Sequence, residues 1–360
     1  MHNFTAEFWA NTVDGLTVGA IYALVALGYT MVYGVLRLIN FAHSEIFMIG
    51  TFGALGAIQL FGFSHPYTGI ALVGVLAVCL MTAMLASGGA AVVLERFAYR
   101  PLRAEPWPWL GRQIQGLDRE LPHTPGLRSA KVVLRWFAAL MTRRGSSSRL
   151  AALISAIGAS VFLQEVFADW IIPNFFQSGS GRDTVGVTRV MDKHTLFHIG
   201  SGDVRNDKLI IFGAAILMML MLDRFVNGTK LGRGIRATAQ DAETAVLLGV
   251  NIDRIVMVTF LVGGLMAGAA GFFFALFYEQ TRFNIGFLLG IKAFTAAVLG
   301  GIGNLRGALV GGFTLGLVEN YGASIFGSQW KDVVAFTILV IILMFRPTGI
   351  LGESLQKARA

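Results

Sequence analysis

Nine long apolar runs, separated by polar stretches, dominate this sequence of 360 residues. A transmembrane helix needs roughly 20 predominantly apolar residues, and only the fifth and ninth runs are clearly short for a full span. Because backbone polar groups in lipid must be satisfied internally, such runs cross the bilayer as helices. We therefore expect an all-α, polytopic integral membrane protein, one domain over residues 1–360, with about eight to nine transmembrane helices. The runs are Gly15–Val35, Phe41–Phe61, Thr68–Val93, Leu150–Trp170, Lys208–Leu222, Ile255–Phe277, Ile285–Ile302, Gly307–Ile325 and Val333–Phe345.

The placement of basic residues predicts how the chain is oriented. Charged residues make up only 14% of the sequence, against about 25% in soluble domains, and the net charge is +8. One set of alternate loops holds 21 of the 29 Lys and Arg residues, the opposite set holds seven, and Lys292 lies within a run. Membrane proteins concentrate Lys and Arg in cytoplasmic loops. This distribution predicts an outside N-terminus, a cytoplasmic C-terminus and a lipid bilayer, rather than nucleic acid, as the partner.

Three loops are long enough to carry structure of their own. Residues 94–149 and 223–254 belong to the strongly basic set and are expected in the cytoplasm, whereas residues 171–207 are expected on the periplasmic side. In this outer loop, Val187–Val190 and Thr195–His198 have a composition suited to small strands. The outer loop is therefore either a docking surface or only a connector.

The second cytoplasmic loop contains a polar island, Gly228–Arg254, between two apolar runs. Its first half is basic and glycine-rich, and its second half has small and apolar residues at helical spacing. Thr238 with Asp241 resembles an N-cap signal, and Gly249 is placed where a helix would stop. The pattern predicts a short amphipathic helix that either lies on the membrane surface or docks a partner.

Two ionisable residues, Lys292 and Glu319, are expected at membrane depth. They lie in consecutive antiparallel runs, each about 8–10 Å below the outer face at 1.5 Å per residue. Charges at this depth are costly, so they are paired or functional by default. We expect the two to pair, as a latch between helices or as a contact to a transported substrate.

A second polar group lies at the inner end of the first apolar hairpin and comprises Asn40, His43, Ser44 and Glu45. One interpretation is a polar helix start that is capped by Asn40. The other is a gate near the cytoplasmic exit of a translocation path.

Small residues recur at a spacing that permits close contact between membrane helices. These GxxxG pairs are Gly15/Gly19, Gly264/Gly268, Gly307/Gly311 and Gly312/Gly316.

Motifs of catalysis and of cofactor binding are absent from the sequence. It contains no P-loop pattern GxxxxGK[ST], no HExxH and no GxSxG. Its single cysteine, Cys79, lies in an apolar run, so a cysteine-based metal site is excluded. We expect no catalytic residues, no metal and no cofactor in this chain, and therefore no ATPase site of this type.

Several long motifs in consistent order resemble one family. They are GAIYALVALGYTMVYGVLRLINFAHSE at Gly19–Glu45, ERFAYRPLR at Glu95–Arg103, LISAIGASVFLQ at Leu153–Gln164, the island Gly228–Arg254, KAFTAAVLGGIGNLRGALVGG at Lys292–Gly312 and KDVVAFTILVIILMFRPTGILG at Lys331–Gly352. Together they resemble the permeases of branched-chain amino acid ATP-binding cassette (ABC) transporters, of the high-affinity LivH type, from about residue 13 to residue 352.

The resemblance implies a multi-pass subunit of the bacterial inner membrane. It implies a second homologous permease, two cytoplasmic ATP-binding subunits and a periplasmic substrate-binding protein as partners. The expected cargo is leucine, isoleucine or valine, although relatives with similar motifs carry urea, short amides or aromatic acids. An autonomous secondary transporter or channel is a further alternative. By the same resemblance, the residues that match the ATPase-coupling segment are Gly232, Arg236, Asp241, Ala245 and Gly249.

One block departs from the pattern of that family. Between about Ala104 and Ser148, within the cytoplasmic loop 94–149, the chain carries a basic insert. Its segment Lys131–Met141 has aromatic, aliphatic and basic residues that suit an anionic membrane face, and a buried loop helix or a flexible insert are the alternatives.

Overall fold

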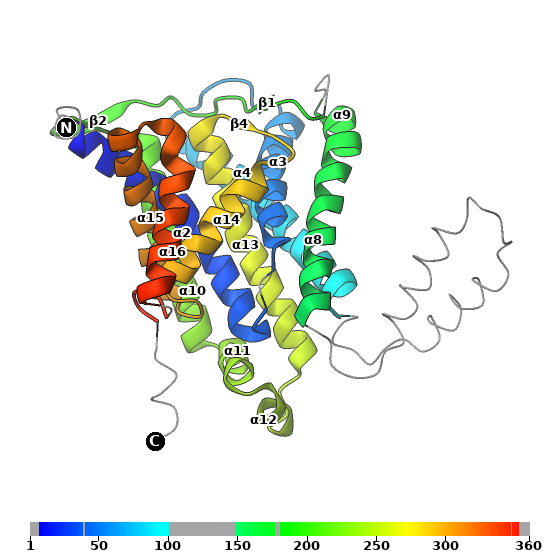
Figure 1. The fold of residues 1–360 in the computed structure, drawn as a ribbon. Coiled ribbons are helices and arrows are strands. Elements are labelled where there is room, and N and C mark those ends of the chain that lie inside the picture. The colour runs from blue at the N-terminus through cyan, green and yellow to red at the C-terminus, as the bar shows by residue number, and fades with distance from the viewer. Residues whose placement is uncertain (1–6, 39, 101–148, 177–180, 347, 353–360) are drawn as a thin grey trace, which may run out of the picture.

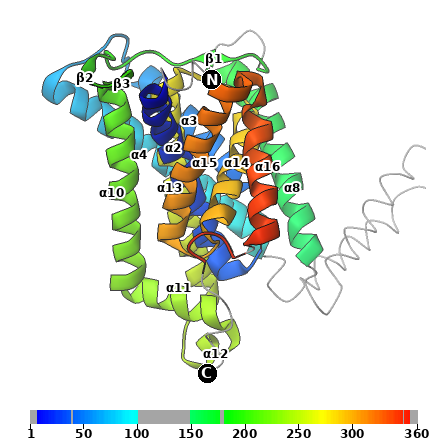
Figure 2. The same cartoon turned by 60° about the vertical axis from the view of Figure 1, so that its left-hand side comes forward.

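The computed structural model describes residues 7–38, 40–100, 149–176, 181–346 and 348–352. Most of its helices run between two ends of the molecule, as Figures 1 and 2 show. One end carries the four short strands (hereafter the strand end), and the opposite end carries α12 (the α12 end). The helices are α2 (Phe8–Leu36), α3 (His43–Leu60), α4 (Gly69–Leu94), α8 (Arg149–Val166), α9 (Ile172–Phe175), α10 (Asn206–Gly228), α11 (Lys230–Gln240), α12 (Ala242–Leu247), α13 (Ile252–Tyr278), α14 (Ile285–Gly300), α15 (Leu305–Phe326) and α16 (Lys331–Phe345).

Each of the nine predicted runs coincides with a helix, so the all-α membrane fold is confirmed. Within the described residues, six helical stretches are long and apolar enough to span a bilayer, and α14 with α15 would form a seventh if this pair, bent by 120°, is one span. Helix α3 is not among the six, and its first turn carries His43, Ser44 and Glu45. The expected count of eight to nine spans is therefore not confirmed.

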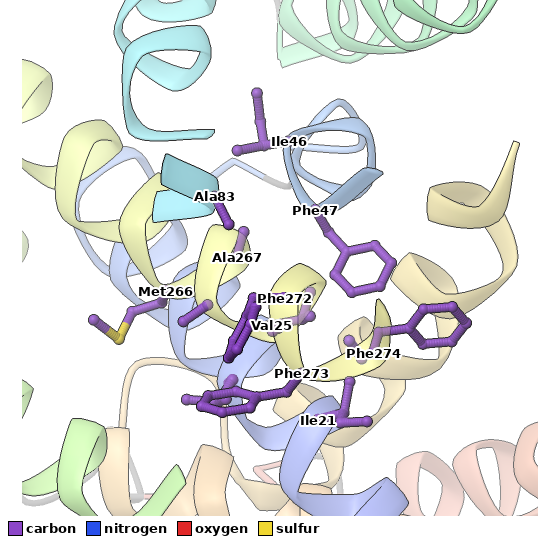
Figure 3. Close-up of a cluster of buried hydrophobic side chains, with 14 of the residues drawn as sticks. Ile21, Val25, Ile46, Phe47, Ala83, Met266, Ala267, Phe272, Phe273 and Phe274 are labelled. Atoms are coloured by element: carbon purple, nitrogen blue, oxygen red, sulfur yellow. The ribbon is translucent and has the colours of Figure 1, made fainter. Parts of the chain in front are cut away.

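Helices α2 and α13 form the centre of the bundle. In their most apolar stretches, α2 is 94% buried and α13 is 72% buried, whereas the helices that contain α4 and α16 are 17% and 6% buried. Figure 3 shows the central contact, where Ile21 and Val25 of α2 lie near Phe273 of α13. The outer helices expose far more apolar surface than a soluble protein tolerates, as expected where lipid covers them.

Close contact between α2 and α15 depends on two facing GxxxG pairs. A Cβ atom built on Gly19 would lie 2.8 Å from the carbonyl oxygen of Gly312, and one on Gly316 would lie 2.3 Å from that of Gly15. Backbone atoms cannot move aside as a flexible side chain can. The two helices therefore pack backbone to backbone, which is what the sequence spacing predicts.

The strand end is closed by two small antiparallel sheets. Strand β1 (Val185–Gly186) pairs with β4 (Gln280–Thr281), and β2 (Thr195–Ile199) pairs with β3 (Gly202–Arg205). The strand expected at Thr195–His198 is present, but the one expected at Val187–Val190 is not.

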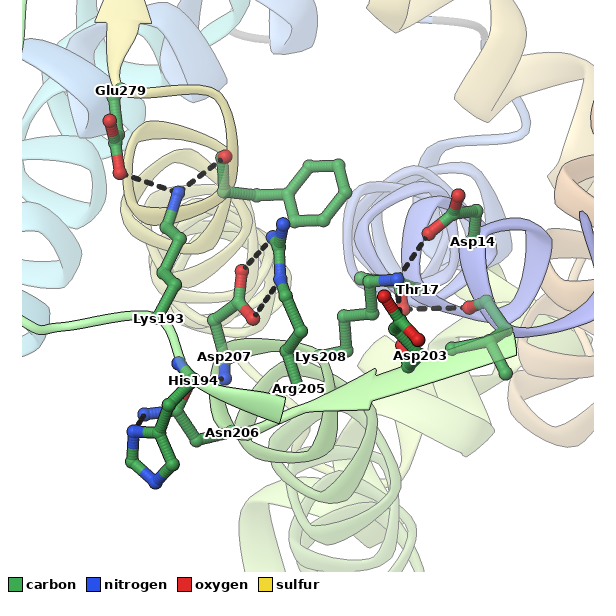
Figure 4. Close-up of polar contacts among 12 residues, drawn as sticks. Asp14, Thr17, Lys193, His194, Asp203, Arg205, Asn206, Asp207, Lys208 and Glu279 are labelled. Atoms are coloured by element: carbon green, nitrogen blue, oxygen red, sulfur yellow. Dashed lines mark hydrogen bonds and ion pairs between the residues drawn. The ribbon is translucent and has the colours of Figure 1, made fainter. Parts of the chain in front are cut away.

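Salt bridges fasten this outer segment to the helix ends, as Figure 4 shows. The pairs are Lys193 with Glu279 at 2.6 Å, Arg205 with Asp207 at 2.6 Å and Lys208 with Asp14 at 2.7 Å. Asp207 is fully buried and takes two nitrogen atoms of the Arg205 guanidinium group, so the start of α10 is held by a bidentate pair. The Lys193–Glu279 pair thus joins residues 181–207 of this segment to the end of α13.

The boundaries of two predicted loops differ from the structure. Helix α4 continues through a π-helical turn, Glu95–Tyr99, because the helical hydrogen bonding does not stop at residue 94. The insert at 104–148, with its segment Lys131–Met141, lies outside the described residues. In the loop predicted at 223–254, α10 extends to Gly228 and α13 begins at Ile252, and the residues between them form two helices, α11 and α12, instead of one.

Candidate functional site

The predicted pair Lys292 and Glu319 meets in the structure. Lys292 Nζ lies 2.9 Å from Glu319 Oε1 and 2.6 Å from Asp332 Oδ1 of α16, while Tyr22 of α2 donates a hydrogen bond of 2.8 Å to Glu319 Oε2. The Lys292 and Glu319 side chains are 9% and 4% exposed, whereas that of Asp332 is 45% exposed. The sequence reasoning missed Tyr22 and Asp332. Asp332 was detectable as an acidic residue directly beside the start of an apolar run.

A cavity of about 250 Å³ borders this ion pair. Besides Lys292 and Glu319, its charged lining includes Arg282 and Lys331, two cations for which the described residues provide no side-chain hydrogen bond or ion pair. The Asn284 side chain also lines it and has a buried, unpartnered Oδ1 atom. The remaining lining residues are mostly apolar and comprise Val18, Ile21, Phe274, Ile285, Leu288 and Leu289, together with the two tyrosines Tyr22 and Tyr278. The cavity thus combines one anionic group, three cationic groups and an apolar wall.

The second buried carboxylate, Glu45, is held in a different way. Its Oε1 accepts hydrogen bonds from Ser44 at 3.1 Å and from two residues of α8, Ser160 at 3.0 Å and Gln164 at 2.9 Å. Its Oε2 is buried without a partner and faces the backbone of α14, since a Cβ atom on Gly286 would lie 3.1 Å away. All three donors are neutral, so this cluster is compensated by hydrogen bonds rather than by a cation. Local sequence spacing gave no signal for the contact with α8.

His43 lies deeper than the sequence suggests. The His43 ring stacks edge-on against Tyr29 at 4.8 Å, and its Nε2 abuts Gly28, eight residues before the end of α2. At 1.5 Å per residue this is about 12 Å inside that end. The chain turns back into the bundle after Arg37, whose φ of 54° is left-handed, so α3 begins inside the bundle rather than at its edge.

The interpretation of Asn40 as a helix cap is wrong. Ala42 occupies the N-cap position of α3, which has no side-chain cap. Asn40 Oδ1 instead accepts a hydrogen bond of 2.8 Å from Tyr99, in the π-helical turn after α4. This contact ties the start of α3 to α4, and Asn40 Nδ2 is left buried without a partner.

Helix α11 of the coupling segment packs tightly against the end of α10. A Cβ atom on Gly232 would lie 2.2 Å from the carbonyl oxygen of Val226, so no other residue fits. Arg236 is exposed and hydrogen-bonds to Asn227 Oδ1. Thr238 bonds to Gly234 within α11, so the expected Thr238 cap is wrong. These contacts fix the angle at which the chain leaves α10.

Helix α12 is capped at both ends by residues that the sequence singled out. Asp241 accepts hydrogen bonds from the backbone amides of Glu243 and Thr244, at 3.0 and 3.3 Å. A hydrogen bond from the Thr244 hydroxyl group, followed by these amide bonds, lowers the pKa of Asp241 below its ordinary value. Ala245 is buried, and Gly249 ends the segment with φ 84°.

Of the outward-facing residues of this segment, Val246 belongs to the helical spacing that predicted the helix, whereas Leu247 and Leu248 were not singled out by the sequence. Val246, Leu247 and Leu248 are 52%, 86% and 76% exposed at the far α12 end. Three consecutive exposed apolar residues in a polar stretch were the available signal, because soluble surfaces avoid them unless they bind something. The residues predicted for coupling therefore shape α11 and α12, and the exposed apolar triplet lies at the surface of the same segment.

Comparison with known proteins covers nearly the whole chain. The profile of a family described as "Branched-chain amino acid transport system / permease component" matches residues 11–117 and 124–343, and its interruption falls inside the predicted insert. The chain is 38% identical to the high-affinity branched-chain amino acid transport system permease protein BraD of Pseudomonas aeruginosa, over 95% of this chain and 94% of that protein. It is 35% identical to the corresponding LivH protein of Escherichia coli, over 96% of each.

Two further likenesses are more limited. The autoinducer 2 import system permease protein LsrC of Yersinia pseudotuberculosis is 31% identical over 36% of this chain and 39% of its own length. A solved structure, PsaBC from Streptococcus pneumoniae in complex with Fab, aligns over 97% of this chain and 93% of that one at 11% identity and a TM-score of 0.38. A TM-score this low carries no argument about the fold.

Proposed function

The chain belongs to the family of permease components of branched-chain amino acid transport systems, and from this we propose that it forms a transmembrane subunit of an ABC importer for leucine, isoleucine and valine. ATP is hydrolysed in partner subunits. The observation that carries the coupling part of the proposal is the apolar triplet Val246, Leu247 and Leu248, which is held out at the α12 end by a tightly built turn. If ATP is bound by partner subunits rather than by this chain, those subunits need a surface on which to dock, and the apolar triplet provides one.

The proposal places the α12 end in the cytoplasm of a bacterial cell and the strand end on the periplasmic side, with the N-terminus outside and the C-terminus inside. Support comes from the exposed basic residues Arg224, Lys230, Arg233, Arg236 and Arg254, all on or beside α11 and α12. Such a concentration is typical of cytoplasmic loops. The described segment 181–207 at the strand end then offers a surface for the external substrate-binding protein.

The transport cycle follows from differential binding. ATP binding in two cytoplasmic subunits moves α12, and the movement passes through α11 to α10 and α13, between which the segment is held. This chain and a second homologous permease rock together to open a shared path to one side or the other. The loaded receptor biases the cycle because it binds one state better than the other.

Within the path, Lys292 and Glu319 are assigned to the outer part and Asn40, His43 and Glu45 to an inner gate. Their contacts on α2 support two levels, since Tyr22 touches Glu319 and Tyr29 touches His43. Seven helical residues separate these contacts by about 10 Å. A cargo molecule would meet the ion pair first and the gate second.

Two alternatives are distinguishable from this proposal. A permease of the same family could carry urea, short amides or aromatic acids, and the relative LsrC is named for a different cargo, autoinducer 2. An autonomous secondary transporter or channel would transport without ATP-binding partners and would leave the apolar triplet of α12 without a role.

The deciding experiment is uptake of labelled leucine, urea and benzoate by cells that carry the complete operon, with and without this gene. We expect leucine uptake alone to require the gene. Uptake of leucine that persists without it contradicts the proposal, and gene-dependent uptake of urea or benzoate selects the alternative cargo.

A second experiment tests the coupling segment. Gly249→Arg forces a non-glycine residue into a left-handed position, and Asp241→Lys removes the cap of α12. We expect both variants to lose co-purifying ATP-binding subunits and uptake. The control is Gly228→Ala, whose added Cβ would meet only the Arg224 side chain, 3.9 Å away. Normal assembly in both variants would exclude the docking role.

A further inference from the structure

We propose that the cavity beside Lys292 and Glu319 is a zwitterion site, which binds an α-amino acid by its ammonium group at one side and its carboxylate group at the other. The inference rests on the proposed function and names the chemistry of its outer site. The volume of about 250 Å³ exceeds the roughly 150 Å³ that admits a benzene-sized molecule, so a small amino acid fits.

Glu319 is the ammonium acceptor. Among the described residues it is the single carboxylate that lines the cavity, and in the structure a primary ammonium group, Lys292 Nζ, already lies 2.9 Å from it. Lys292 also contacts Asp332 at 2.6 Å, so it keeps a counter-ion when a substrate ammonium takes its place on Glu319. The buried carboxylate is then never left uncompensated, which would cost far more than the exchange.

The carboxylate of the substrate is bound by Arg282 and Lys331. Both line the cavity, and neither has another charged partner among the described residues. Helix α14 begins at Ile285, which lines the same cavity. The positive end of its helix dipole therefore favours an anion there. Half-helices that begin within a membrane protein serve transported carboxylates in this way.

The apolar side chain of the substrate has its own wall. Val18, Ile21 and Leu289 are buried lining residues from α2 and α14, and Phe274 contributes an aromatic face from α13. A branched aliphatic side chain buried here is stabilised by the apolar surface that it removes from water, and a polar side chain of equal size is not. The three features together select a zwitterion with an apolar side chain.

The test uses the full-length permease with its partner permease in lipid nanodiscs, without the external receptor. Binding of labelled leucine is measured in competition with its oxo-acid analogue, which lacks the ammonium group, and with isoamylamine, which lacks the carboxylate group. Glu319→Gln is expected to weaken leucine binding about tenfold or more while the oxo acid is unaffected. Arg282→Gln with Lys331→Met is expected to weaken leucine and the oxo acid by a similar factor while the amine is unaffected. Arg182→Gln, at the same end but outside the cavity, is the control.

Native leucine affinity in these variants, or an oxo acid that competes as well as leucine, overturns the inference. Arg282 is exposed and Lys331 is partly exposed, so their variants remain informative even where Glu319→Gln unfolds the bundle. If leucine uptake in cells requires the gene but the variants bind leucine normally, only this inference fails. If uptake does not require the gene, the proposed function fails.

Discussion

The two ends of the bundle are built by different means. At the strand end, buried ionic side chains line a cavity, and Lys292 forms ion pairs with both Glu319 and Asp332. At the α12 end, the backbone determines the structure, because Gly232 has no room for a side chain and Gly249 is left-handed. The strand end is therefore sensitive to changes of charge, and the α12 end is sensitive to added atoms.

This difference corresponds to the role proposed for each end. A cavity for a charged molecule needs fixed groups that a ligand can compensate, whereas a docking element needs a fixed shape that presents apolar residues. A change of charge that keeps the capping oxygen of α12, and a change of volume at the strand end, should both be milder than the reverse. Four substitutions test this contrast.

The largest effect is expected from Gly232→Val at the α12 end. The first added atom would lie 2.2 Å from one backbone oxygen and 2.4 Å from another, so α11 must move as a whole. We expect loss of the α10–α11 packing and of co-purifying ATP-binding subunits. Amide hydrogen exchange of residues 230–250 measures the packing directly, with Gly228→Ala as the tolerated control. Protected amides in the valine variant would show that the turn is not set by this contact.

At the strand end, Lys292→Met should destabilise the bundle by about 3–5 kcal/mol, because it leaves Glu319 buried without a cation. Adding Glu319→Gln to the same protein should recover part of this loss. The free energies of unfolding of the two single variants and the double variant give the coupling free energy between Lys292 and Glu319, which we expect to be about 1–3 kcal/mol. Losses that simply add would mean that the two groups do not interact. The claim that the strand end depends on paired charges would then be wrong.

Much of this contrast was predictable from local sequence patterns. The depth of Lys292 and Glu319 in consecutive runs predicted their contact, and the facing GxxxG pairs predicted the packing of α2 on α15. Glycine spacing and helix periodicity act within a few turns of one segment, so a single sequence is enough to see them.

The contacts that were missed join distant segments. Glu45 meets Ser160 and Gln164 of α8 across more than a hundred residues, and nothing in either segment encodes which helix lies beside it. The return of the chain after Arg37 was missed for a different reason: a left-handed turn at a non-glycine residue is set by the packing on both sides. Sequence patterns thus located the ionisable groups but not the neutral donors around Glu45.

The difference between the two buried carboxylates gives the third prediction. Glu45→Gln keeps an oxygen that accepts from Ser160 and Gln164, and no cation is stranded by it. We expect a loss of no more than about 1.5 kcal/mol in the free energy of unfolding, from rearranged hydrogen bonds. Glu319→Gln, which strands part of the Lys292 charge, is the matched comparison and should cost more. Equal losses would show that a neutral cluster and an ion pair respond alike.

The smallest effect concerns charge at the α12 end, where Asp241 caps α12. The pKa of Asp241 is lowered in the folded protein. Its charge therefore stabilises the cap fully at pH values above the unfolded pKa of about 3.9. This contribution is lost as the pH falls through the folded pKa. The backbone amide resonances of Glu243 and Thr244 should therefore shift on acidification below about pH 4. Asp241→Ser retains a capping oxygen but has no carboxyl group, so its amide resonances should not follow that titration. If the serine variant shows the same pH midpoint, the titrating group lies elsewhere, and the α12 end depends on backbone shape alone.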